Sequence, residues 1–361
     1  MPEQTIARVS DFTGGHWGTA GPTAAMATQW GGANMALTRR GGVAPVSAAR
    51  TLPIDAHPGR VWGMRYAWGL DGYVYYVQTN GTVGYVRRFD PSDPDATTIT
   101  VSDVGGLNAL PSVTPDWTLS SSSLYVTIYG DTSYVINPTT PSVTALTGGS
   151  GAAPAGRTVC VYGERMLVGG ISDSRFGTYK GRVVYSAAAD FTDWPALNFF
   201  DVGAGDHQVR ALVPMSDRCL IVLDDGQVWI LSGVPGVNDS LRRFYGFERA
   251  AGAITAMLPQ HVAVDPSQTK AWIYDHTMRM VSRFNGASMQ RIPGFGFPGS
   301  TRTMADEVQG SVSVIGGPDE VFVDRVALPR VGDEGVGERY GLLRLNGAWA
   351  AIDTANLFGE S

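Results

Sequence analysis

Two stretches of the chain repeat each other at a spacing of about 45 residues, a length typical of one blade of a β-propeller. Residues 209–214 (VRALVP) are similar to residues 254–259 (ITAMLP). Downstream, residues 227–230 (QVWI) are similar to residues 270–273 (KAWI). Such repeats bury their core between stacked sheets, so we expect any functional groups on the loops.

Strand-like runs joined by short turns recur from residue 60 onward. Asn80-Gly81 lies between two runs rich in β-branched and aromatic residues. This dipeptide predicts a tight hairpin in which both turn residues tolerate positive φ. No segment keeps a period of 3.6 residues over three turns, so very little helix is expected. Further turns of this kind are expected at residues 130–131, 163–164, 224–226, 316–319 and 346–347.

The spacing predicts an all-β fold, a β-propeller of about six four-stranded blades. Its blades should start near residues 60, 114, 158, 209, 254 and 305. Five blades, seven blades and paired β-sandwiches are the alternatives. Sandwiches are disfavoured because they do not explain why Trp229 and Trp272 recur one blade apart, at what we expect to be equivalent strand positions. Residues 1–56 should form an irregular arm with short strands, one near Met35–Arg39, and residues 57–361 a single propeller domain.

Composition narrows the classes of function. The formal net charge is −6, which argues against a general nucleic-acid-binding surface. Cys160 and Cys219 lie in apolar runs and are expected to be buried free thiols. The first residues lack the basic and apolar regions of a signal peptide, and no run of 18 apolar residues predicts a membrane span. The chain is therefore expected to be made in a cytoplasm.

No catalytic, cofactor-binding or metal-binding residues are predicted. Residues 90–95 (DPSDPD) lack the glycine and glutamate of a calcium loop and are interpreted as a solvated loop. Asp190, Asp193 and Trp194 resemble a sialidase aspartate box without its glycine and are interpreted as a blade corner. The 33 acidic residues leave open a glycosidase pair of carboxylates. The histidines show no zinc spacing and are expected on turns or the surface: His16, His57, His207, His261 and His276.

Two segments are candidates for a protein interface, because arginine and aromatic residues are enriched at binding hot spots. The first is an arginine- and aromatic-rich run, with packing inside a blade as its alternative. The second is a loop rich in proline and glycine. The candidate residues are Arg242, Arg243, Phe244, Tyr245, Phe295 and Phe297.

Several of these motifs together resemble those of tailed-bacteriophage propeller proteins. In that family a Val-Tyr-Ser strand leads to an Asp-Trp turn and then to a strand that ends in Asp-Val-Gly. The next blade opens with Ala-Leu-Val-Pro and closes with Trp-Ile-Leu-Ser-Gly. Here the corresponding residues are 181–186 (GRVVYS), 190–195 (DFTDWP), 198–203 (NFFDVG), 211–214 (ALVP), 229–233 (WILSG) and the N-terminal 34–42 (NMALTRRGG).

The resemblance implies a non-enzymatic virion component, such as a tail, nozzle, hub or tail-adaptor protein. It would be assembled in the bacterial host cytoplasm, in several copies around the tail axis. Its partners would be other tail proteins and copies of itself in a cyclic homo-oligomer, with transient contact to passing DNA if it lines a channel. The alternatives are a propeller glycan hydrolase or lyase that acts on host surface polymer, and a module that binds host saccharide through Trp62, Trp68 and Trp117.

Overall fold

The structure is a computed structural model in which the chain forms two compact units, Leu52–Gln260 and Met1–Thr51 with His261–Ser361. The described residues contain no α-helix, and none of their helical turns is long and apolar enough to cross a bilayer. They are residues 15–16, 29–30, 35–37, 43–45, 60–67, 70–92, 99–244, 261–264, 267–275, 280–291, 312–314, 321–329, 337–345 and 348–353.

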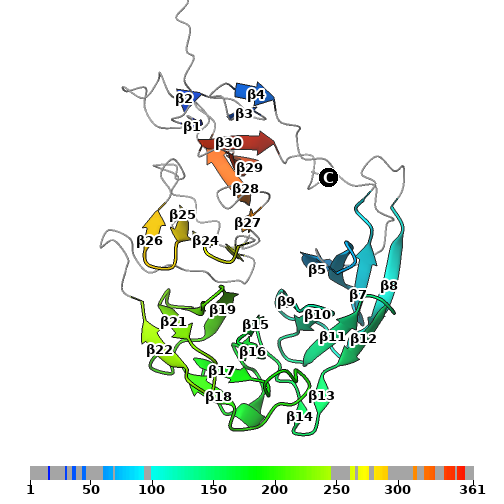
Figure 1. The fold of residues 1–361 in the computed structure, drawn as a ribbon. Helices are drawn as coiled ribbons and strands as arrows, with labels where there is room; N and C mark the ends of the chain where they lie inside the picture. The colour runs from blue at the N-terminus through cyan, green and yellow to red at the C-terminus, as the bar shows by residue number, and fades with distance from the viewer. Residues whose placement is uncertain are drawn as a thin grey trace, which may run out of the picture. The chain divides into compact units, whose positions relative to one another are not determined.

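The first unit holds four consecutive antiparallel sheets of four strands each, with the strands of each sheet in chain order (Figure 1). Blade 1 is β5 (Arg60–Tyr66), β6 (Val74–Thr79), β7 (Gly84–Phe89) and β8 (Val101–Gly106). Blade 2 is β9 (Asp116–Leu119), β10 (Leu124–Thr127), β11 (Ser133–Asn137) and β12 (Ser142–Ala145). Blade 3 is β15 (Thr158–Tyr162), β16 (Arg165–Gly169), β17 (Arg182–Tyr185) and β18 (Phe199–Asp201). Blade 4 is β19 (Val209–Pro214), β20 (Arg218–Leu223), β21 (Val228–Ser232) and β22 (Ser240–Arg243).

Two short elements lie in the connections of this unit. The hairpin of β13 (Thr147–Gly148) and β14 (Gly151–Ala152) precedes blade 3, and the 3-10 turn η2 (Ser174–Phe176) lies between β16 and β17. Neither adds a strand to a blade.

The core of this unit lies between successive blades. The first strand of blade 3, β15, contacts the first strands of both neighbours, β9 and β19. One apolar cluster joins blades 1 and 2, a second joins blades 2 and 3, and a third joins blades 3 and 4. The second strand of an inner blade is therefore covered on both faces, which explains why β10 of blade 2 is buried at all four positions from Leu124 to Thr127 instead of alternating.

The second unit holds two further four-stranded sheets, which contact each other through β23 and β27. Their strands are β23 (Val262–Val264), β24 (Ala271–Asp275), β25 (Met280–Phe284) and β26 (Met289–Arg291), then β27 (Val312–Val314), β28 (Val321–Pro329), β29 (Gly337–Leu345) and β30 (Ala348–Asp353). The short strands β1 (Gly15–His16) and β2 (Gln29–Trp30) pair in parallel, and β3 (Met35–Leu37) and β4 (Val43–Pro45) pair antiparallel. Strands β1 and β3 contact β30.

Six four-stranded meanders confirm the predicted fold class, an all-β propeller with blades of four strands. The first four blades start within two residues of the expected positions, at residues 60, 116, 158 and 209. The last two start later than expected, at residues 262 and 312. The division into an arm of residues 1–56 and a single domain of residues 57–361 stays a prediction.

The expected equivalence of Trp229 and Trp272 is wrong. Trp229 lies on β21, the third strand of its sheet, whereas Trp272 lies on β24, the second strand of its sheet. The first strands of these two sheets start 262 − 209 = 53 residues apart, so a repeat of about 45 residues falls one strand short. The similarity of the two tetrapeptides reflects a shared β pattern and not a shared place in the blade.

The turn at Asn80-Gly81 also differs from its prediction. Gly81 has a φ of +95°, but Asn80 does not adopt positive φ. The Asn80 side-chain oxygen instead accepts hydrogen bonds from the backbone N–H groups of Thr82 and Val83, at 3.2 and 3.0 Å. This capping stabilises a longer loop than the two-residue turn expected. The tight turn with two positive φ angles occurs at Gly163 and Glu164, at +57° and +60°.

A polar relay ties together the first strands of three blades. Asp116 on β9 accepts hydrogen bonds from the Thr158 hydroxyl at 2.7 Å and from the Val159 N–H at 2.8 Å, both on β15. The Thr158 hydroxyl in turn accepts a hydrogen bond from the Leu212 N–H of β19 at 3.0 Å. Burial raises the pKa of Asp116 to about 6, although these hydrogen bonds and the nearby Arg65 guanidinium favour the ionised carboxylate.

Because the pKa of Asp116 is raised, we predict that this residue makes a pH-dependent contribution to the free energy of unfolding. The folded chain holds the Asp116 proton more tightly than the unfolded chain, whose pKa is near 3.8. The resulting stabilisation is fully present below about pH 4 and is lost as the pH rises through about 6. We expect this contribution to the free energy of unfolding to be about 1–3 kcal/mol. The lower part of the range applies if solvent screens the Asp116 carboxyl, which keeps part of its surface accessible. Urea unfolding at pH 4 and pH 7 should show this difference in wild type and lose it in Asp116→Asn; an unchanged difference in the variant would assign the effect elsewhere.

Candidate functional site

The meander topology divides the loops of the first unit between two ends of the blades. Loops that precede a first strand, and loops that join second to third strands, lie at one end, called here the start end. Loops that join first to second and third to fourth strands lie at the other, called here the turn end. Residues far apart in sequence therefore meet at each end.

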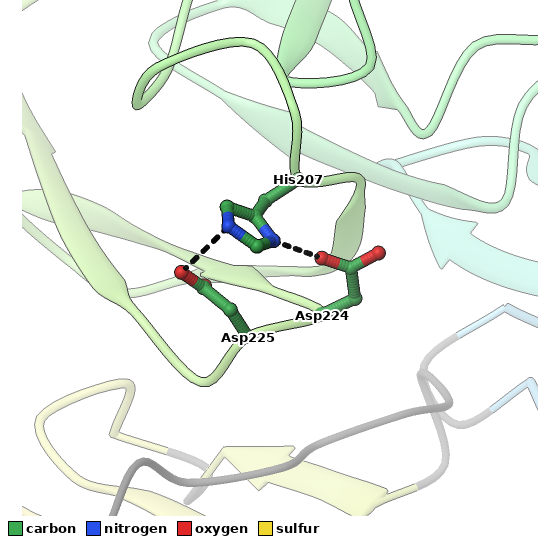
Figure 2. Close-up of side chains that lie close together, drawn as sticks. All are labelled: His207, Asp224 and Asp225. Carbon is green, nitrogen blue, oxygen red and sulfur yellow. Dashed lines mark hydrogen bonds and ion pairs between the residues drawn. The ribbon is translucent and has the colours of Figure 1, made fainter.

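A histidine and two aspartates meet at the start end of blade 4 (Figure 2). His207 lies just before β19, and Asp224 and Asp225 lie in the loop between β20 and β21. His207 Nδ1 is 3.1 Å from Asp224 Oδ1, and His207 Nε2 is 3.4 Å from Asp225 Oδ2. The Asp224 N–H donates to the Gln208 carbonyl at 2.9 Å, which fixes the two loops together.

Two arginines adjoin this cluster. Arg210 is the bulged residue of β19, and its guanidinium lies 3.7 Å from Asp224 Oδ2. Arg157, before β15, stacks over the Tyr129 ring at 4.2 Å. Burial lowers the pKa of Arg210, and the neighbouring charge of Arg157 lowers it further, against the opposing effect of Asp224. The arginines and the aspartates therefore largely compensate one another.

The cluster supplies one imidazole and two carboxylates, whose ligand atoms lie within 4.8 Å of one another. Such donors suit a divalent cation, but both imidazole nitrogens already face carboxylates and Arg210 contributes an opposing charge. The arrangement is an ion-pair network that joins two loops. This network was not predicted from the sequence. The pattern that indicates it is a histidine directly before the first strand of a blade and an Asp-Asp-Gly turn after the second strand, because the topology places these two segments at the same end of the blade.

A shallow hollow of about 500 Å³ also lies at the start end, lined by residues that include Tyr179, Arg182 and Asp206. The Arg182 guanidinium in this hollow donates two hydrogen bonds to the Asp201 carboxylate, at 2.6 and 2.7 Å. The Tyr179 hydroxyl donates to the Gly203 carbonyl at 2.7 Å. The polar groups of the hollow thus mainly hold its own wall together.

The turn end of blades 3 and 4 exposes large apolar side chains. Leu197, in the loop between β17 and β18, is 85% exposed. Val237 and Val234, in the loop between β21 and β22, are 72% and 37% exposed. We call these three residues the turn-end surface. The two loops flank Tyr185, because its N–H donates to the Asn198 carbonyl at 2.9 Å and a Cβ at Gly236 would lie 2.6 Å from its hydroxyl.

Both loops are held rigidly by internal contacts. The Trp194 side chain, 1% exposed, donates to the Phe191 carbonyl at 2.9 Å and anchors the first loop. In the second loop, Asn238 Oδ1 accepts from the Val234 N–H at 2.8 Å, and Asp239 Oδ1 accepts from the Gly236 N–H at 2.7 Å. Apolar side chains on preformed loops lose little conformational entropy when a partner covers them.

The predicted interface residues are placed differently. Arg242 and Arg243 are exposed on β22, the outer strand of blade 4, which pairs with β21. Phe244, the residue after β22, is buried at 6% exposure. Tyr245, Phe295 and Phe297 lie outside the described residues.

Other sequence predictions can be located as well. Cys160 and Cys219 are buried free thiols, as expected. Trp194 is buried in the loop between β17 and β18 of blade 3, whereas Asp193 is half-buried and Asp190 is exposed on the same loop. Of the tryptophans considered for saccharide binding, Trp117 is buried in the core at 7% exposure and Trp62 packs against the same cluster, whereas Trp68 lies outside the described residues.

Comparison with known proteins yields likenesses of fold only. No protein-family model matches the chain, and no curated protein matches its sequence. Among solved structures, the computationally designed Ika8 protein is 12% identical with a TM-score of 0.45, over 84% of this chain and 73% of that chain. The β-propeller domain of Cps50 (Swd1) from Myceliophteria thermophila is 12% identical with a TM-score of 0.47, over 79% of this chain and 83% of that chain. Neither likeness bears on function.

Proposed function

We propose that this chain is a non-enzymatic structural component of a tailed-phage particle, a tail, hub or tail-adaptor protein that assembles in several copies. The observation that carries the proposal is the turn-end surface, where preformed loops keep the side chains of Leu197 and Val237 exposed to solvent. The motifs that resemble phage propeller proteins lie on β17, β18, β19 and β21 and on the first of these loops. Of the three surface residues, Leu197 lies between the motifs at 190–195 and 198–203, and Val234 directly follows the motif at 229–233.

The occupant that we assign to the turn-end surface is a second copy of this chain. In a ring of identical subunits, one face of each copy contacts a different face of the next copy. The ring closes when the rotation between neighbours is a whole fraction of a full turn. The net charge of −6 makes each copy an acidic partner for the exposed arginines of β22. Leu197 and Val237 would form the apolar centre of the contact and Arg242 its polar rim.

The other proposed partners are the neighbouring tail proteins and passing DNA. At the start end, Arg157 and Arg210 offer positive charge to phosphates, and Asp224 and Asp225 oppose it. Mixed charge of this kind would allow brief contacts without tight binding. The saccharide-binding alternative loses support because Trp117 belongs to the core.

Mass spectrometry of purified particles tests the virion assignment. Particles from the source culture are banded in a density gradient, digested and quantified against isotope-labelled peptides of this chain. We expect several copies per particle, retained through a second gradient. Absence of the chain from particles that contain the other tail proteins would overturn the assignment.

A further inference from the structure

The two cysteines of the chain meet across two blades. Cys160 is on β15, the first strand of blade 3, and Cys219 is on β20, the second strand of blade 4. Their sulfur atoms lie 3.8 Å apart, and the side chains are 1% and 0% exposed. The sequence of 361 residues contains no other cysteine, so the only two thiols of the chain are neighbours although 58 residues separate them.

The surroundings of the pair are apolar. Leu167, Ile221 and Leu231 belong to the same core cluster between blades 3 and 4. Burial raises the pKa of the Cys160 thiol, and the adjacent Cys219 sulfur raises it further. The Cys160 thiol is therefore protonated and slow to react while the blades stay closed.

We propose that Cys160 and Cys219 are a latent disulfide that staples blade 3 to blade 4 when the protein meets a small-molecule disulfide. A disulfide needs a sulfur–sulfur distance of about 2 Å, so the two sulfurs, which now lie 3.8 Å apart, must approach by roughly a further 2 Å.

The reaction balances with oxidised glutathione as the oxidant. One protein thiolate attacks a glutathione sulfur, forms a mixed disulfide and releases one reduced glutathione. The second protein thiolate then attacks the protein sulfur of that mixed disulfide and releases the second reduced glutathione. The protein loses two hydrogens overall, and one small disulfide becomes two thiols.

The bond would matter most for a protein that moves between redox compartments. In a host cytoplasm the thiols stay reduced, so the blades pack without a covalent constraint. After release of a particle, oxidation would close a loop of about 60 residues and stabilise the folded chain. This timing rests on the proposed function, whereas the disulfide itself does not.

The test uses the purified full chain, incubated under native conditions with oxidised glutathione or with dithiothreitol. We expect oxidation to remove two hydrogens from the intact mass, to yield a Cys160–Cys219 linked peptide, and to raise Tm by roughly 5 °C or more relative to the reduced chain. Dithiothreitol should reverse all three changes. The single variants Cys160→Ser and Cys219→Ser should show neither the linked peptide nor the rise in Tm.

Three outcomes would overturn the proposal. They are free thiols that persist after prolonged oxidation at a urea concentration just below unfolding, links only between different chains, or a linked chain whose Tm falls. Because wild type is compared with itself in two redox states, the result does not depend on the stability of any variant. Absence of the chain from particles would leave this result untouched, so failure of the proposed function and failure of the disulfide are distinguishable.

Discussion

Replacing Trp194 with alanine should lower the free energy of unfolding by about 3–5 kcal/mol and Tm by roughly 10 °C. The indole is 1% exposed and packs between blades 2 and 3 against residues that include Met166, Phe176 and Val184. Its removal leaves a cavity that the surrounding strands cannot fill, and it leaves the Phe191 carbonyl without its side-chain donor. Circular dichroism during urea and thermal unfolding measures the loss.

Two control variants show which property of Trp194 causes the loss of stability: the volume of its ring, its hydrogen bond or its position. Trp194→Phe keeps most of the ring volume and should recover a large part of the stability. Trp229→Ala removes the same side chain from a half-buried position on β21 and should cost less than Trp194→Ala. Equal losses for the two alanine variants would contradict the assignment of Trp194 as the anchor of the loop that carries Leu197.

Local sequence patterns predict the strands and most of the blades correctly. Hairpin turns and β-branched runs indicate where strands lie, because these signals depend on neighbouring residues alone. Residues 159–168 (VCVYGERMLV) and 212–221 (LVPMSDRCLI) each read as a strand, an acidic-Arg turn and a strand, and they fall in β15–β16 and β19–β20, the first two strands of their sheets. The buried thiols were also expected, because their runs are apolar throughout.

The position of a strand within its blade could not be predicted in the same way. All four strands of a blade share the two-residue period, so a tryptophan on a second strand looks like one on a third. The connection after β22 is longer than a regular repeat allows, and Trp272 therefore falls one strand earlier than Trp229. A spacing alone does not reveal which connection carries the additional residues.

Contacts between residues far apart in sequence could not be predicted for a different reason. The approach of Cys160 to Cys219, and of His207 to Asp224 and Asp225, depends on how loops and strands far apart in sequence are packed. Local patterns contain no information on such distances. Phe244 shows the same limit, since the Arg-rich segment beside it does not reveal that its side chain is only 6% exposed.

Replacing both Leu197 and Val237 with aspartate should abolish self-association of the purified protein. Each substitution places a carboxylate at the centre of the proposed contact, where its desolvation costs several kcal/mol in total. A loss of about 3 kcal/mol already weakens association by more than a hundredfold. Both side chains are exposed, at 85% and 72%, so the fold itself should be unaffected.

A matched control is provided by Leu110, an exposed apolar residue in the connection between β8 and β9, at the start end. Leu110→Asp makes the same chemical change at 41% exposure and should leave association unchanged. Circular dichroism should give the same Tm for the double variant, the control and wild type. A double variant with a lowered Tm would indicate that the two loops stabilise the fold, and the association result would then be read from Leu197→Ala and Val237→Ala.

Sedimentation velocity of wild type beside the Leu197→Asp, Val237→Asp double variant tests most directly whether this propeller assembles through its turn-end surface. We predict that wild type sediments as a discrete closed oligomer and that the double variant sediments as a folded monomer at the same concentration. A monomeric wild type across the accessible concentrations, or a double variant that assembles like wild type, would contradict the account.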